Sequence, residues 1–141
     1  ERKRKRPKWS PSHRRRWPKA ILALVSCSKE SRLNKKIDGT WDIVSVNGLM
    51  PSSIGLTSMT IEFTKDKKGK GAFTTKMTEG TLSESSTGTY VLTDDTKITM
   101  TDTPTSGEVS TPEEMTINSY SKTDLTMTSV EDKTVIILKK K

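Results

Sequence analysis

The chain has 141 residues, of which 30% are hydrophobic, and a formal net charge of +8. Such a length accommodates one domain and a tail, and the low apolar content argues against a large dry core. Residues 1–26 hold ten Lys/Arg and one acid, whereas residues 27–141 hold fifteen Lys/Arg and sixteen acids, so the folded part is near neutral and no nucleic-acid-binding surface is expected on it.

Residues 1–19 carry dense like charge and three prolines, so they cannot fold alone. One interpretation is a basic arm for nucleic acid or an anionic membrane, with Trp9 and Trp17 as stacking or interfacial side chains. We favour the charged part of an export signal, or sequence upstream of the true start site, because an apolar run follows directly. A twin-arginine export motif at residues 14–19 is a weaker match, because Pro18 stands where an apolar residue is expected.

The apolar run, residues 20–25, leads into a single cysteine and is too short to span a bilayer. Leu24-Val25-Ser26-Cys27 resembles the lipobox of bacterial lipoproteins, in which the cysteine thiol is lipidated and becomes the new N-terminus. The alternative is a buried strand with a core cysteine. Cys27 has no second cysteine with which to form an internal disulfide. We expect it to carry a lipid anchor that attaches the protein to a membrane.

Residues 28–38 are mostly polar, but Leu33 and Ile37 stand four residues apart, which predicts one or two helical turns with an apolar edge. The stretch Gly39-Thr40-Trp41-Asp42-Ile43-Val44-Ser45-Val46 then alternates in polarity and is rich in β-branched residues, which predicts a strand. One buried Trp removes roughly 150–250 Å² from water. We therefore expect the core to assemble around Trp41, with its ring packed over the Leu33/Ile37 segment.

The rest of the chain alternates with a period of two, and residues 27–141 contain 22 threonines, which suit exposed strand faces. The alternation predicts eight short strands, at residues 40–46, 58–64, 71–77, 88–93, 97–101, 114–120, 124–129 and 133–138. No segment resembles a crossover helix, so hairpins join the strands. The predicted fold is all-β: an eight-stranded antiparallel up-and-down barrel with a short N-terminal helical segment.

The connections predict two different ends of the barrel. Long connections are expected at residues 47–57, 78–87 and 102–113, and shorter ones at 65–70, 94–95 and 121–123. Alternate connections of an up-and-down barrel lie at opposite ends, so one end is tightly tied and the other is ringed by long loops. The first long loop contains Leu49, Met50, Ile54 and Leu56. We expect these side chains to fold over the open end as a partial lid, or to plug it without a guest.

The tied end is also expected to face the membrane. The first strand starts there, so residues 28–38 and the lipid on Cys27 lie near it. The last strand returns to the same end, which brings Lys139, Lys140 and Lys141 beside the anchor. Lysines at that position would meet anionic headgroups, and the long-loop mouth would face away from the membrane.

Several stretches resemble a known family. Cys27-Ser28-Lys29-Glu30, Ile37-Asp38-Gly39-Thr40-Trp41 and Tyr120-Ser121-Lys122-Thr123-Asp124-Leu125 are similar to the small lipocalin-like lipoproteins of Bacteroidetes. This resemblance covers residues 27–141 and implies a calycin-type, lipocalin-like barrel on an outer-membrane lipoprotein, with no catalytic set. The implied organisation is a basic leader and signal-like segment at 1–26, a lipobox cysteine and tether at 27–38, and the barrel at 39–141.

The resemblance also implies binding of a small apolar molecule. Five of the six methionines fall on the predicted apolar face, where flexible thioethers adapt to varied guests. Candidate ligand-binding residues are Trp41, Phe63, Phe73, Met77, Tyr90, Met100, Met115 and Met127 in the interior, with Leu49, Met50 and Ile54 at the mouth. The alternative is a filled core in a monomeric structural or interaction lipoprotein, which binds a protein or glycan partner through its loops.

Enzymatic function is not expected from these residues. The only histidine, His13, lies in the basic tail, so no His-based catalytic set or His/Cys metal cluster is available in residues 28–141. Carboxylates are present, among them Glu62, Asp94, Asp95 and Glu114. No nucleophile–base pair accompanies them, and we expect no cofactor and no metal.

Overall fold

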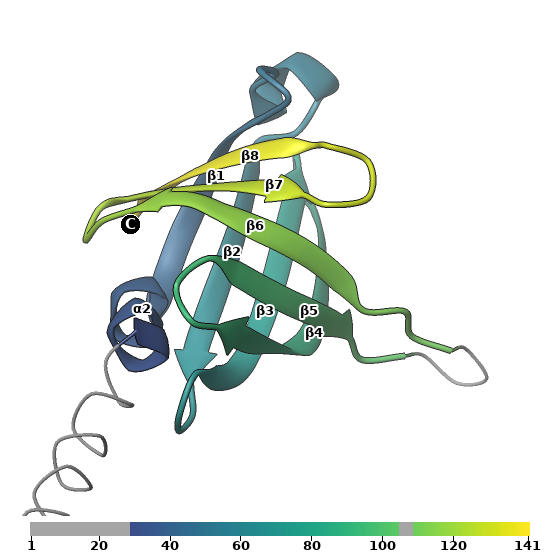
Figure 1. Cartoon of the computed structure of the whole chain (residues 1–141). Helices are drawn as coiled ribbons and strands as arrows, with labels where there is room; N and C mark the ends of the chain where they lie inside the picture. The colour runs from purple at the N-terminus through teal and green to yellow at the C-terminus, as the bar shows by residue number, and fades with distance from the viewer. Residues whose placement is uncertain (1–28, 105–108) are drawn as a thin grey trace, which may run out of the picture.

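The computed structural model describes residues 29–104 and 109–141, and within them eight strands follow one α-helix. The strands close into a barrel in which each pairs antiparallel with the next along the chain, and β8 returns to pair with β1 (Figure 1). The predicted fold class is confirmed. Cys27 and the basic leader lie outside the described residues.

The elements follow the period-two pattern of the sequence. They are α2 (Lys29–Ile37), β1 (Gly39–Val46), the 3-10 helix η1 (Pro51–Ile54), β2 (Ser58–Lys65), β3 (Lys70–Glu79), β4 (Leu82–Thr93), β5 (Lys97–Asp102), β6 (Glu113–Tyr120), β7 (Asp124–Ser129) and β8 (Val135–Lys140). In β7, for example, Leu125, Met127 and Ser129 are buried and the threonines between them are half-exposed. No helix in the described part of the chain is long and apolar enough to cross a membrane.

One predicted connection is wrong. Residues 78–87 do not form a long loop, because β3 and β4 continue to a two-residue turn at Gly80-Thr81, where Gly80 has a φ of 61°. Cross-strand pairs such as Thr75↔Ser86 and Met77↔Glu84 extend the ladder. β4 pairs with β5 only from Gly88 onward, whereas β3 stays paired with β2 as far as Thr78, so the outer part of β4 is paired with β3 alone among the described strands. The outer part of β4 is exposed, so its residues need not be apolar. The serine and threonine residues there are compatible with a strand, since threonine in particular favours extended structure.

The helix α2 closes the end of the barrel at which the short connections lie (Figure 1). Leu33, Ile37 and Trp41 are at most 1% exposed and belong to one core cluster. The Trp41 indole Nε1 donates a hydrogen bond to the Ile37 carbonyl at 2.8 Å. The predicted burial of Trp41 against this helical segment is therefore confirmed.

The half of the barrel next to α2 is filled by aromatic rings. The rings of Phe63 and Tyr90 meet edge to face, with centroids 5.4 Å apart. Two glycines provide the space: Gly71 stands opposite Tyr90, and Gly88 stands opposite Phe73. A Cβ atom on Gly88 would lie 2.6 Å from carbons of the Phe73 ring. A side chain at either position would therefore push a ring out of the interior.

A polar contact links this filled half to the helix. Tyr90 donates its hydroxyl to Asn34 Oδ1 at 2.5 Å, and Asn34 Nδ2 donates to the Lys70 carbonyl at 3.1 Å. Burial, with a smaller contribution from the charges of Asp38 and Asp66, raises the pKa of Tyr90 well above its usual range. The tyrosine therefore stays neutral and keeps its proton available for Asn34.

Candidate functional site

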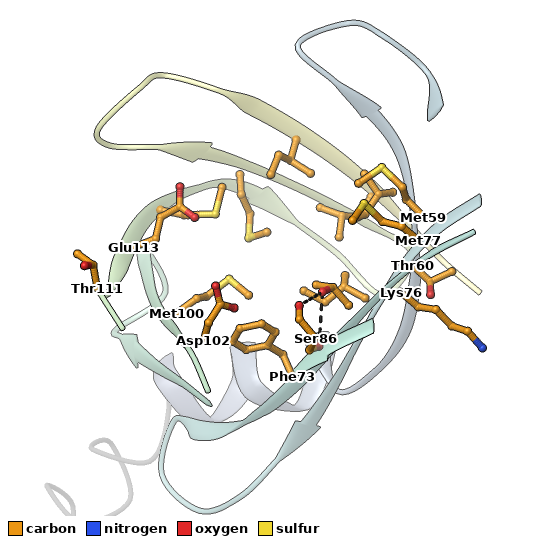
Figure 2. Close-up of a pocket in the computed structure, with 17 residues that line it drawn as sticks. Met59, Thr60, Phe73, Lys76, Met77, Ser86, Met100, Asp102, Thr111 and Glu113 are labelled. Carbon is orange, nitrogen blue, oxygen red and sulfur yellow. Dashed lines mark hydrogen bonds between the residues drawn. The ribbon is translucent and has the colours of Figure 1, made fainter. Parts of the chain in front are cut away.

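The other half of the barrel, away from α2, holds a cavity of about 370 Å³ (Figure 2). This volume lies within the range of roughly 300–1,000 Å³ that is typical of small-molecule sites. Its walls come from β1 to β8, and the lining residues are Ile43, Met59, Thr60, Ile61, Phe73, Thr75, Lys76, Met77, Ser86, Met100, Asp102, Thr111, Glu113, Met115, Met127, Ile136 and Leu138.

Methionine side chains form much of this wall. All five methionines of the predicted apolar face, which are Met59, Met77, Met100, Met115 and Met127, line the cavity. Met59 and Met77 are direct cross-strand partners in β2 and β3, and both lie at one side of the opening in Figure 2. The sixth methionine, Met50, is 58% exposed and lies outside the cavity.

The wall formed by β3 and β4 has little unsatisfied polar surface. Phe73 is buried and presents its ring to the cavity (Figure 2). The hydroxyls of Thr75 and Ser86 are 2.6 Å apart and hydrogen-bond to each other. Because these two groups satisfy one another, this wall makes little hydrogen-bonding demand on a guest.

Charged side chains line the outer part of the cavity. Asp102 continues the inward alternation of Ile98 and Met100, and Glu113 stands two residues before the inward Met115. Figure 2 shows both carboxylates within the ring of strands, whereas the Lys76 amine points away from it. Ser129 donates its hydroxyl to Glu113 Oε2 at 3.2 Å.

The residues expected to bind a ligand divide into three groups in the structure. Five of them line the cavity: Phe73, Met77, Met100, Met115 and Met127. Three lie in the filled half and do not reach it: Trp41, Phe63 and Tyr90. The three at the predicted lid, Leu49, Met50 and Ile54, are between 54% and 58% exposed and do not line it.

The first long loop therefore does not cover the cavity. Its start is fixed beside the last strand, since the backbones of Val46 and Leu49 bond to each other and Asn47 Oδ1 accepts a hydrogen bond from the Val135 amide at 2.8 Å. The 3-10 helix η1 then ends at Ile54, and Gly55, which has a φ of 85°, caps it and turns the chain toward β2. Hydrogen bonds thus hold the start of the loop beside β8, and η1 contacts β1 and β2. Leu56 is half-buried and lines a smaller hollow with Met77 and Glu84.

Several cavity residues were missed by the sequence analysis. Ser86, Asp102 and Glu113 were assigned to connections, but each lies on a strand and faces the cavity. The signal was the period-two alternation, which continues outward from the apolar positions. When strands are predicted from apolar residues alone, a polar residue at an inward position is not recognised as part of the strand.

The carboxylates named in the sequence analysis are exposed or paired with other side chains, as follows. Glu62 is exposed on β2, Asp94 accepts a bond from Thr96, Asp95 accepts one from Tyr120, and Glu114 lies 3.5 Å from Lys97. None of these carboxylates lines the cavity. Among residues 29–104 and 109–141 there is no group of three or more His, Cys, Asp or Glu side chains that could hold a metal ion.

A family model described as a lipocalin-like domain matches residues 37–127. The match runs from the end of α2 into β7 and includes every cavity-lining residue except Ile136 and Leu138. The lipocalin-like fold is generally a non-enzymatic binding fold, and it generally binds small hydrophobic ligands. No curated protein matches the chain.

Proposed function

We propose that this chain, which belongs to the lipocalin-like domain family, binds a small and largely apolar molecule in the methionine-lined cavity. The observation that carries the proposal is the gathering of five methionines, from five of the eight strands, around one cavity. Thioether side chains are flexible and polarisable, so they adjust to guests of irregular shape. Buried Phe73 adds a rigid aromatic surface to the lining.

The division of the barrel supports this role. Three large side chains, Trp41, Phe63 and Tyr90, fill the half next to α2 and are at most 1% exposed. The cavity therefore lies next to a well-packed part of the core and is already formed before a ligand binds. Binding then has a lower cost of ordering side chains. The alternative of a filled barrel with binding through its loops has less support, because about 370 Å³ of the interior is open.

A fluorescent naphthylamine probe tests the proposal. N-phenyl-1-naphthylamine is neutral and apolar, and its emission increases when it leaves water. Thr75→Phe places a ring in the cavity, whereas Thr74→Phe places the same ring on the outer face of β3. We expect wild type and Thr74→Phe to bind the probe and Thr75→Phe to bind it at least about tenfold more weakly, since overfilled space excludes a guest.

Circular dichroism would first establish that both variants keep the barrel. Equal binding by the two folded variants would show that the probe binds elsewhere. Absence of binding by the wild-type protein, to this probe and to other apolar molecules of similar size, would contradict the proposal.

We further propose that the protein is a bacterial envelope lipoprotein attached through Cys27, with no catalytic activity of its own. Support for the anchor comes from the lipobox-like Leu24-Val25-Ser26-Cys27 and from the resemblance to outer-membrane lipoproteins of Bacteroidetes. Mass spectrometry of the natural protein tests it, because lipidation would leave a modified Cys27 at the N-terminus. An intact, unmodified basic leader would contradict both the anchor and the envelope location.

The position of the helix supports a particular orientation on the membrane. α2 begins at Lys29, two residues after Cys27, and Lys140 of the last strand contacts Asp38 just after this helix. We propose that this end faces the membrane and that the cavity opens away from it. Spin labels at Lys141 and Thr111 in vesicles test the proposal. Deeper membrane contact at Thr111 than at Lys141 would contradict it.

A further inference from the structure

We propose that the cavity selects organic cations: molecules with an apolar body and a positively charged group at the end that lies in the mouth. This inference rests on the proposed binding function and names the chemical class of the ligand. It follows from the sign and direction of the charges around the cavity, and from their position relative to the apolar wall.

The charges that face inward are negative. Three charged residues line the cavity, namely Lys76, Asp102 and Glu113. The carboxylates of Asp102 and Glu113 project within the ring of strands, and the Lys76 amine projects away from it (Figure 2). A guest in the cavity would therefore meet two carboxylates and no inward ammonium group from these three residues.

Within residues 29–104 and 109–141, no ion pair neutralises this negative charge. Among the described residues, neither Asp102 nor Glu113 forms an ion pair, and Lys97 pairs instead with Glu114, at 3.5 Å. The hydrogen bond from Ser129 orients the Glu113 carboxylate but leaves its charge in place. A cationic guest would supply the missing counter-charge.

The neighbouring surface adds charge of the same sign. A smaller hollow is formed by the outer part of the β3–β4 hairpin, and it shares Met77 with the cavity. Glu79 and Glu84 line this hollow. Clefts lined by one sign of charge raise the local concentration of oppositely charged ligands, so the hairpin would favour approach of a cation to the mouth.

On β5 and β6 the charged part of the cavity lies farther out than the apolar part. Asp102 and Glu113 stand one inward position farther out than Met100 and Met115 on the same strands, and Phe73 lies in the buried wall. This order matches a molecule with a charged head and an apolar tail. Fatty-acid-like anions have the same tail but the opposite head charge, and the two carboxylates would repel them.

Three eight-carbon probes that differ only in the head group test the inference: octylammonium, 1-octanol and octanoate. Their affinities can be measured by displacement of N-phenyl-1-naphthylamine at low ionic strength and neutral pH. We expect octylammonium to bind about tenfold more tightly than octanol and octanoate to bind most weakly, since two solvent-accessible charge pairs each change affinity by a few-fold. Added salt should reduce the difference.

A matched pair of double variants assigns the effect to the cavity. Asp102→Asn with Glu113→Gln removes two inward carboxylates, and Glu62→Gln with Glu114→Gln removes two exposed carboxylates that do not line the cavity. The first variant should lose the preference for octylammonium, and the second should retain it.

The outcomes separate this inference from the proposed function. Equal binding of all three probes, or tighter binding of octanoate, would overturn the charge selectivity and leave the apolar site standing. Retention of the preference by the Asp102→Asn, Glu113→Gln variant would also overturn it. If the naphthylamine binds but none of the three probes displaces it, the charge selectivity is likewise overturned and the apolar site stands. If the naphthylamine itself does not bind, the proposed function fails.

Discussion

The Lys140 ammonium nitrogen lies 4.7 Å from the centroid of the Trp41 ring. The same nitrogen donates hydrogen bonds to the Lys36 carbonyl at 3.0 Å and to the Asp38 carbonyl at 2.6 Å. One side chain of the last strand thus joins the first strand to the end of α2. This contact places a positive charge where the carbonyl groups of a helix end carry negative partial charge.

Replacement of Lys140 should show how much this contact contributes to the stability of the folded protein. We expect Lys140→Met to reduce the free energy of unfolding by about 2 kcal/mol, because two charged hydrogen bonds and a cation–π contact are lost. Lys139→Met is the control, since Lys139 makes only an exposed pair with Asp124 and should cost less than about 1 kcal/mol. Urea denaturation measures both. Equal losses in the two variants would contradict the structural role of Lys140.

Trp41 should contribute strongly to the stability of the filled half of the barrel. Trp41→Ala removes a fully buried ring and its hydrogen bond to Ile37, so we expect a loss of roughly 3–5 kcal/mol. Val91→Ala, on the outer face of β4 where the valine is 46% exposed, should cost less than about 1 kcal/mol. Denaturant titration of both variants tests this. A loss below about 1 kcal/mol for Trp41→Ala would show that the core is centred elsewhere.

Gly88 should not tolerate even the smallest side chain. A new Cβ would overlap the Phe73 ring, which is a side chain and can move, and the Thr101 carbonyl, which is backbone and cannot move easily. We expect Gly88→Ala to cost about 1–3 kcal/mol and to weaken binding of the naphthylamine probe by displacing Phe73. Thr89→Ala, the exposed neighbour, should change stability by less than about 0.5 kcal/mol. A stable Gly88→Ala variant with unchanged probe binding would contradict the packing described.

Tyr90 should make the fold sensitive to alkaline pH. Its pKa is raised in the folded state, mainly by burial, whereas an unfolded chain has a tyrosine pKa of about 10. The folded state therefore retains its full stability below pH of about 10 and loses stability as the pH rises above that value, because only the unfolded chain ionises readily.

The protein has two tyrosines, so Tyr120→Phe leaves Tyr90 as the single reporter. We expect tyrosinate absorbance of this variant to appear together with loss of the circular dichroism signal. Ionisation of Tyr90 near pH 10 in a barrel that stays folded would contradict its burial and its hydrogen bond to Asn34.

Local patterns in the sequence predicted most of the architecture. Alternation of apolar and polar residues identified eight strands, and the spacing of Leu33 and Ile37 identified the helix, because both signals depend only on which neighbouring side chains share a face. The sequence of β8 alone is compatible with either Ile136 and Leu138 or Val135 and Ile137 facing inward. Pairing with β1, in which Leu138 stands opposite Ile43, places Leu138 in the core.

The sequence by itself thus determined the fold class, the number of strands and the burial of Trp41. Only the tertiary structure decided the length of the β3–β4 hairpin, the position of the first loop and the division of the interior into a filled half and a cavity. The physical reason is that empty space depends on the summed volumes of side chains that meet at one level of the barrel. Those side chains come from strands far apart in the sequence, and only the register between strands brings Met59 beside Met77, or Gly88 beside Phe73.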